Sequence, residues 1–183
     1  MPWGLKRYQL SGESHFVTFT CFHRQPLLQH STAKRAVESG LERIRRKYRL
    51  KVYAYVVMPE HVHLLVSEPE VEILSVAIKS LKQGVSRRLI GDAEHFWQKR
   101  YYDFNVHDDR KFVEKLKYIH RNPVKRGLVG RPEDWEWSSF RHWATGMEGR
   151  VGIESDWTAR KRERAGIFLT VKIREPHSSQ SQA

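Results

Sequence analysis

The shortest connection in the chain constrains its fold most. Two stretches rich in β-branched and aromatic residues, 51–58 and 61–67, are separated by Pro59 and Glu60 alone. Such residues favour strands, and two strands joined by so few residues can only form a hairpin, in which proline suits the turn. We therefore expect two antiparallel neighbours, the second of which begins at His61.

Three stretches carry apolar residues at the spacing that places them on one side of a helix. These stripes are Ala33, Val37, Leu41 and Ile44; Ile73, Leu74, Ala77, Ile78, Leu81, Val85 and Leu89; and Phe112, Val113, Leu116 and Ile119. The predicted helices span 31–48, 70–90 and 108–123. Ser31 or Thr32 is expected to cap the first helix. Asp108 or Asp109 should cap the third, which Pro123 should break.

Two further stretches, 15–22 and 96–106, predict strands, so the order is strand, helix, strand, strand, helix, strand. This order predicts an α+β fold, a ferredoxin-like split βαβ antiparallel sheet with helices on one face. Beyond the third helix, we expect a helical and aromatic C-terminal extension packed back onto the domain. Its large aromatic residues are Trp135, Trp137, Phe140 and Trp143. Because such a fold hosts many functions, its function has to come from a site.

The chain is strongly basic, with 33 Lys and Arg against 21 Asp and Glu among 183 residues, a net charge of +12. An excess of this size predicts a polyanionic partner, because neutralised phosphates release counterions. A charge that serves solubility alone is the alternative. The single cysteine, Cys21, excludes an intramolecular disulfide and is expected in the core. Because no apolar run is long enough to span a bilayer, we expect no membrane partner and a cytoplasmic location.

Two histidines two residues apart interrupt the otherwise apolar second strand of the hairpin. Side chains alternate along a strand, so His61 and His63 point to the same face, roughly 7 Å apart along the strand. Two imidazoles so placed can bind one divalent ion and leave positions open for phosphate oxygens. The alternative is a pair of ordinary sheet histidines. Glu60 is expected to be an exposed carboxylate in the turn. The alternatives are that it is a further metal ligand or that it hydrogen-bonds to one of the ligands.

The third predicted helix carries a tyrosine away from its apolar stripe. Tyr118 lies about 120° to 150° from the centre of the stripe at ~100° per residue, and Asn122 stands one turn on, beside it. Lys111 and Lys115 flank this side and are candidates to contact a phosphate. A phenol with an ordinary pKa near 10 needs help as a nucleophile, which a nearby divalent cation supplies. A surface tyrosine that packs along its ring is the alternative.

The strand with His61-Val62-His63 and the helix from Tyr118 to Val129, with its Tyr-Ile-His-Arg-Asn-Pro-Val sequence, resemble the single-tyrosine HUH transposases. The branch associated with repetitive extragenic palindromes is the most similar, and the resemblance covers residues 8–145. It includes 97–103 and 135–140. The resemblance implies a catalytic domain over 1–145, followed by an extension over 146–170. Residues 171–183 contain Pro, Ser and Gln without an apolar pattern, and we expect this tail to be disordered.

The same resemblance implies the chemistry. His61, His63 and Asn122 would bind Mg²⁺ or Mn²⁺, and Tyr118 would attack a phosphodiester in single-stranded or hairpin DNA. The product is a 5′-phosphotyrosyl link and a free 3′-hydroxyl, which can reverse the step on another strand. One stretch departs from the family, because residues 12–16 keep the glycine of a Gly-Thr-Trp-Tyr-like segment that reads the hairpin foot but lack its tryptophan.

Several further residues are candidate DNA contacts. The basic ones are Arg87, Arg88, Arg100, Lys111, Lys115 and Arg121. Tyr101 and Tyr102 could stack on unpaired bases, because stacking accepts any base, or could pack against the sheet.

Two other functions remain open from the sequence, and a third is disfavoured. A basic nucleic-acid-binding protein without chemistry leaves the histidine pair and Tyr118 unexplained. A histidine-based nucleotide hydrolase needs a third histidine at the next alternate position of the strand, where Leu65 stands. A domesticated transposase with a host role would keep the same residues. The sequence leaves both monomer and homodimer open.

Overall fold

A computed structural model of the chain describes residues 12–90 and 95–167. The strands are β1 (Ser14–Thr20), β2 (Val52–Val57), β3 (His61–Ser67) and β4 (Tyr102–Val106). The helices are α1 (Ser31–Lys47), α2 (Leu74–Ile90), α3 (Asp109–Lys125), α4 (Phe140–Thr145) and α5 (Asp156–Arg164), with short 3-10 turns at Phe22–Arg24 and Pro132–Asp134. The predicted disordered tail, 171–183, lies outside the described residues. No helix within the described ranges is long and apolar enough to cross a membrane.

The four strands form one antiparallel sheet in the order β2-β3-β1-β4. This is the predicted ferredoxin-like arrangement, with the β2–β3 hairpin at one side. The register between β1 and β3 sets His63 opposite Thr18 and His61 opposite Thr20. The strand predicted over 96–106 is shorter than expected, because only its last five residues pair in the sheet and Trp97 makes an isolated bridge to Cys21.

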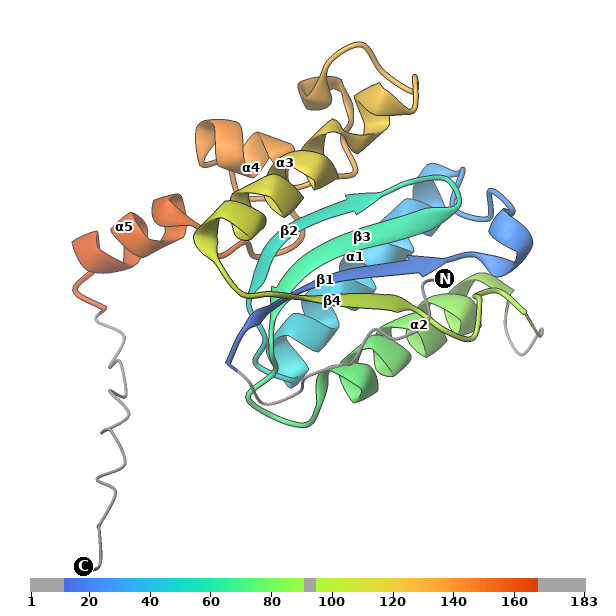
Figure 1. The fold of residues 1–183 in the computed structure, drawn as a ribbon, viewed down its shortest axis with the longest axis horizontal. Coiled ribbons are helices and arrows are strands. Elements are labelled where there is room, and N and C mark those ends of the chain that lie inside the picture. Colours follow the sequence, from blue (N-terminus) through green and yellow to red (C-terminus); the bar gives the residue numbers. More distant parts are fainter. Residues whose placement is uncertain (1–11, 91–94, 168–183) are drawn as a thin grey trace, which may run out of the picture.

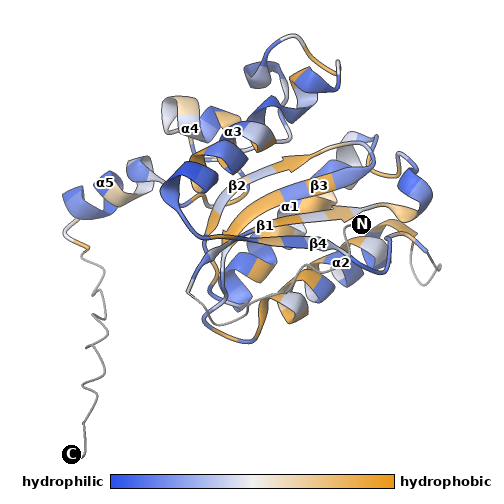
Figure 2. Cartoon of the chain, in the orientation of Figure 1, coloured by the Kyte–Doolittle hydropathy of each residue, from blue (hydrophilic) through white to orange (hydrophobic). Residues whose placement is uncertain are grey.

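Helices cover both faces of the sheet. α1 and α2 pack together on one face, over Val17, Phe19 and Leu64, as the sequence predicted. α3 lies across the opposite face, as Figure 1 shows, and buries Ile119 against a second cluster that includes Leu65. The two helices between the strands therefore share one face, as predicted, whereas α3, which follows the last strand, covers the other face. The physical reason is that the second face of the sheet also carries apolar residues, among them Phe16, Val56 and Leu65, so it too needs a cover. The largely hydrophobic strands are visible in Figure 2.

Most residues of the apolar stripes are buried or, like Leu89, Phe112 and Leu116, half-buried, and two outer positions are exposed. Ile73 precedes the first residue of α2 and is 39% exposed, and Val113 on α3 is 43% exposed. In the first stripe every predicted residue is buried. Cys21 is also buried, and burial raises the pKa of its thiol to about 12, so it is the core residue that the sequence predicted.

The helix ends differ from prediction in two places. The N-cap of α1 is His30, so neither Ser31 nor Thr32 caps it, whereas Asp108 caps α3 and accepts a hydrogen bond from the Lys111 backbone at 2.7 Å. Pro123 does not break α3, which continues to Lys125. Pro123 lies in the last turn of the helix, where its missing N–H interrupts few helical hydrogen bonds. The Arg126 N–H donates to the Asn122 carbonyl, and the Leu128 N–H donates to the Pro123 carbonyl.

The aromatic extension packs back onto the domain, as predicted. Residues 137–139 run along the free edge of β2, where Val57 N donates to Trp137 O at 2.9 Å and Ser139 N donates to Tyr55 O at 3.0 Å. The Ser139 hydroxyl also contacts Nε2 of His120 on α3, at 2.8 Å. This buried contact joins the extension, the edge strand and α3 at one point.

Burial of His120 predicts a pH-dependent stability. Desolvation lowers the pKa of His120 from 6.5 to about 4. Below pH 6.5 the unfolded chain therefore binds a proton at this residue that the folded chain does not bind, which lowers the free energy of unfolding. The stability that the neutral, buried His120 contributes is fully present above pH 6.5 and is lost as the pH falls towards 4. Between pH 7 and pH 4.5, urea unfolding should show that wild type loses about 2 kcal/mol more stability than His120→Gln. An equal pH dependence of the two proteins would contradict this.

Candidate functional site

β3 holds the two histidines on the face that α3 covers. Because they occupy alternate positions, His61 and His63 share this face, and each is 5% exposed. Their Nε2 atoms lie 3.0 Å apart and their ring centroids 4.5 Å apart. The strand therefore presents two ring nitrogens directed at one point.

Glu60 fixes the orientation of His61. Its carboxylate accepts a hydrogen bond from His61 Nδ1 at 3.1 Å and pairs with the Arg126 guanidinium at 2.7 Å. Because a carboxylate only accepts, the proton of the neutral ring sits on Nδ1 and the Nε2 lone pair faces His63. Glu60 is only 7% exposed, so the prediction that it is an exposed carboxylate in the turn is wrong. The reason is that the end of α3 brings Arg126 onto the hairpin.

His63 is held by two residues of β1. Its Nδ1 lies 2.7 Å from the Thr18 hydroxyl, and its ring stacks on Phe16 with centroids 5.4 Å apart. Burial lowers the pKa of His63 well below its ordinary value, and it lowers that of His61 despite the opposing charge of Glu60. Both rings are therefore neutral at pH 7, the state in which imidazole binds metals.

α3 brings Tyr118 over the histidine pair. The Tyr118 ring lies edge-on to His63, with centroids 5.3 Å apart, and edge-on to Phe16 at 5.8 Å. The side chain is 39% exposed, which leaves room for a partner to approach the phenol. A single chain thus brings together the strand histidines and the helix tyrosine that the sequence singled out.

Asn122 lies one helical turn beyond Tyr118 and points into the same site. It is 5% exposed, and its Nδ2 lies 3.4 Å from His63 Nε2. Its Oδ1 is buried without a hydrogen-bond partner among the described residues. Buried polar atoms are normally paired. The orphaned oxygen therefore marks a place for a further group.

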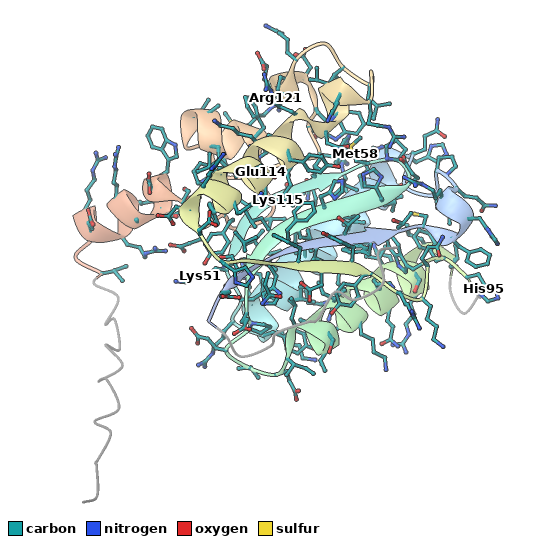
Figure 3. The ribbon with its side chains drawn as sticks, in the orientation of Figure 1. Lys51, Met58, His95, Glu114, Lys115 and Arg121 are labelled. Carbon is teal, nitrogen blue, oxygen red and sulfur yellow. The ribbon has the colours of Figure 1, made fainter. Side chains whose placement is uncertain are left out.

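The three predicted DNA contacts on α3 lie in different places. Lys115 reaches back over the sheet, with Nζ 5.1 Å from the Phe16 ring centroid, beside the site (Figure 3). Lys111 is exposed and pairs with Glu114 at 2.9 Å. Arg121 is exposed on the outer side of the helix (Figure 3). Of the three, only Lys115 adjoins the histidines.

The other predicted contacts divide between the two faces. Arg87 and Arg88 are exposed on α2, which covers the face away from the histidines. Tyr101 packs against the core of that same face, which is the alternative of sheet packing. Arg100 instead lines a groove beside Thr18, on the histidine face.

The stretch that departs from the family pattern is tied to neighbouring strands. Burial alone would lower the pKa of His15, but Asp103 at 2.8 Å and Glu68 at 3.4 Å outweigh it and raise the pKa. Glu13 accepts a hydrogen bond from Asn105 at 3.0 Å. These side chains therefore hold the start of β1 in place.

Sequence reasoning missed the supporting residues Thr18 and Arg126. Both act through pairings that depend on strand register and on where α3 ends, which no local pattern encodes. The adjacency of Glu60 and His61 was the one available signal, because adjacent titratable residues at a strand start can interact through the turn.

Two neutral histidines on a strand, with a tyrosine and an asparagine one turn apart on a helix above them, define a single-tyrosine HUH domain. The chain belongs to the transposase IS200-like family, whose model matches residues 9–122.

Two relatives and one solved structure agree with this. A Haemophilus influenzae protein named "Putative REP-associated tyrosine transposase" is 32% identical over 106 residues, which cover 51% of this chain and 60% of that protein. The "REP-associated tyrosine transposase" of Escherichia coli K12 is 26% identical over 136 residues, 74% of this chain and 81% of the relative. The structure of a REP-associated tyrosine transposase bound to a REP hairpin matches with a TM-score of 0.68 at 21% identity. That match covers 96% of this chain and 99% of the other and shows a shared fold.

The contact between Glu60 and Arg126 should couple the hairpin to the end of α3. A double-mutant cycle with Glu60→Gln and Arg126→Gln, measured by urea unfolding, should give a coupling of about 1 kcal/mol, since the half-exposed Arg126 is partly screened. The exposed pair Arg131–Asp134 is the matched control and should show no measurable coupling. Equal coupling in the two pairs would contradict a special role for Glu60.

Proposed function

We propose that this protein nicks and rejoins DNA, with Tyr118 as the nucleophile and single-stranded or hairpin DNA as the substrate. One observation carries the proposal: a half-exposed phenol lies over a buried pair of neutral imidazoles, beside an amide oxygen that lacks a partner. The alternative of an ordinary surface tyrosine does not explain why polar groups converge beneath it. A binding protein without chemistry would need none of them.

The proposed step is a transesterification. The Tyr118 oxygen bonds to phosphorus as the bond from phosphorus to the 3′-oxygen breaks, which leaves a 5′-phosphotyrosyl link. The phenolic proton passes to water, and the departing 3′-oxygen takes a proton from water. The number of phosphoester bonds is unchanged, so the reverse step can join the 3′-hydroxyl of another strand without a further energy source.

The donor set fits a divalent metal. The Nε2 atoms of His61 and His63 lie 3.0 Å apart, and adjacent ligands of an octahedral ion at about 2.1 Å would be about 3.0 Å apart. A half-turn of the Asn122 amide exchanges its oxygen and nitrogen, so the side chain can offer oxygen on the histidine side. Among the described residues, no three His, Cys, Asp or Glu side chains gather as a metal site, so Asn122 is the proposed third ligand.

Bound Mg²⁺ or Mn²⁺ would polarise the scissile phosphate and favour the phenolate. The protein's own groups do the rest: Glu60 and Thr18 orient the two rings, and Phe16 packs against both His63 and Tyr118. Lys115 supplies a cation beside the site. Because Tyr118 and His63 of the same chain are in contact, we propose that one chain can complete the reaction.

The substrate class follows from charge and from the relatives. A net charge of +12 favours a polyanion. The similar solved structure is described as bound to a REP hairpin, and we propose a hairpin-bearing strand as the partner here too. The cytoplasmic location stays a prediction.

The nucleophile is tested by trapping. Incubation with Mn²⁺ and a hairpin-bearing single strand from the DNA flanking its own coding region should yield a protein–DNA adduct that survives SDS. Tyr118→Phe removes the attacking oxygen and should reduce the adduct at least 10³-fold, since no other group replaces the nucleophile. Tyr53→Phe, at a tyrosine that packs against Phe112 and lies outside the proposed site, is the matched control and should keep the adduct. An adduct from Tyr118→Phe would disprove the assignment.

The histidines are tested by separating binding from cleavage. His61→Ala and His63→Ala should each weaken Mn²⁺ binding, measured by electron paramagnetic resonance, and abolish adduct formation. DNA binding should stay within about three-fold, because phosphate contacts elsewhere supply most affinity. His107→Ala, which replaces an exposed histidine, is the control and should change neither property. Parallel loss of DNA binding and cleavage would favour a structural role for the pair.

A further inference from the structure

A basic groove opens beside the histidines, on the part of the sheet face that α3 leaves uncovered. Its volume is about 500 Å³, within the range of sites that hold small ligands. The lining residues are Thr18, Thr20, Arg24, Gln98, Lys99, Arg100 and Tyr102. Three of the seven carry a positive charge and none carries a negative one. A polyanionic chain would therefore enter this groove with no acidic group to repel it.

The groove is a built part of the fold. Residues 97–99 continue the sheet past the end of β1, through the bridge from Cys21 to Trp97 and a 2.9 Å hydrogen bond from Gln98 N to Thr20 O. From the other face, Lys82 donates to Gln98 O at 2.7 Å and braces this segment. The floor of the groove is thus held by backbone hydrogen bonds.

The rim at Arg24 is strained. His23 and Arg24 have φ of 50° and 56°, a region that non-glycine residues rarely adopt. The turn is held by hydrogen bonds from Arg24 N to Cys21 O and from Phe22 N to Phe96 O, both 2.9 Å. Strained backbone persists where the surroundings enforce it, and it is common at ligand contacts. Here it sets a cation at the mouth of the groove.

The position of the groove relative to Tyr118 indicates which side of the nick the groove faces. Along β1, Phe16 contacts Tyr118, Thr18 faces His63 and Thr20 faces His61. The nucleophile therefore stands at one end of this row, and the groove opens at the other. In phosphoryl transfer the attacking and leaving oxygens lie roughly in line. The leaving 3′-oxygen is thus directed away from Tyr118 and towards the groove.

We propose that this groove binds the DNA segment on the 5′ side of the nick, the one that leaves with the 3′-hydroxyl. The inference rests on the proposed function of Tyr118 and adds a subsite to it. Arg24, Lys99 and Arg100 contact phosphates of the segment, and the half-buried Tyr102 ring offers a surface for a base. Retention of this segment keeps the 3′-hydroxyl beside the phosphotyrosine and favours rejoining.

The groove itself is tested first, without cleavage. In a Tyr118→Phe background, the variant Arg24→Gln/Arg100→Gln should bind a fluorescent random-sequence 12-nucleotide single-strand pool about ten-fold more weakly in an anisotropy titration. The slope of log affinity against log salt should fall by about 1.4, as expected for two lost phosphate contacts. The matched control Lys79→Gln/Arg87→Gln removes the same charge from α2 and should weaken binding less than two-fold. Equal losses of affinity in the two variants would overturn the proposal that the groove binds DNA.

The direction is tested with fragments defined by mapping the nick in the Tyr118 adduct. The groove variant should lose affinity for the fragment that ends in the 3′-hydroxyl and keep its affinity for the fragment that begins at the nick. It should also slow rejoining at least ten-fold more than adduct formation. A loss confined to the other fragment would reverse the assigned direction and overturn the proposal. If no adduct forms with any strand, the function of Tyr118 fails, while the pool titration still decides whether the groove binds DNA.

Discussion

The packing of α3 across the second face of the sheet is the contact on which the site depends. Ile119 is fully buried beneath this helix, and on either side of it His120 contacts Ser139 and Tyr118 faces outward over His63. Ile119, together with the half-buried Phe112 and Leu116, thus anchors the helix on the sheet. Four and eight residues after Tyr118, Asn122 and Arg126 reach the histidine pair and its carboxylate. Without this packing, the strand would present two imidazoles to solvent, with no tyrosine beside them.

Burial controls the electrostatics of the site. Desolvation lowers the pKa of both His61 and His63, so that two rings 3.0 Å apart remain neutral and do not repel each other as cations. Glu60 and Thr18 hydrogen-bond the outer ring nitrogens and leave the inner ones free. Positive charge lies around this neutral centre, on Lys115 and on the groove residues Arg24, Lys99 and Arg100. The proposed metal ligands and the cations proposed to attract a polyanion are therefore separated in space.

The two faces of the sheet have different structural roles. The face under α1 and α2 holds most of the hydrophobic core, and its charged residues, such as Arg87, lie far outside on helix surfaces. The other face is only partly covered, because α3 spans β2 and β3 and leaves the end of β1 open. The core face provides stability, which allows the other to keep buried polar groups and a strained turn.

The sequence by itself determined the order of elements, the hairpin, and the residues Tyr118, His61, His63 and Asn122. These follow from local period, from a connection too short for anything but a turn, and from two motifs in the right order. Only the tertiary structure decided that α3 crosses the second face, that Pro123 stays inside it, and that Glu60 is buried. It also assigned Tyr101 to the core and Arg100 to the groove. The reason is that strand register and helix packing depend on contacts between residues distant in sequence, which local patterns do not encode.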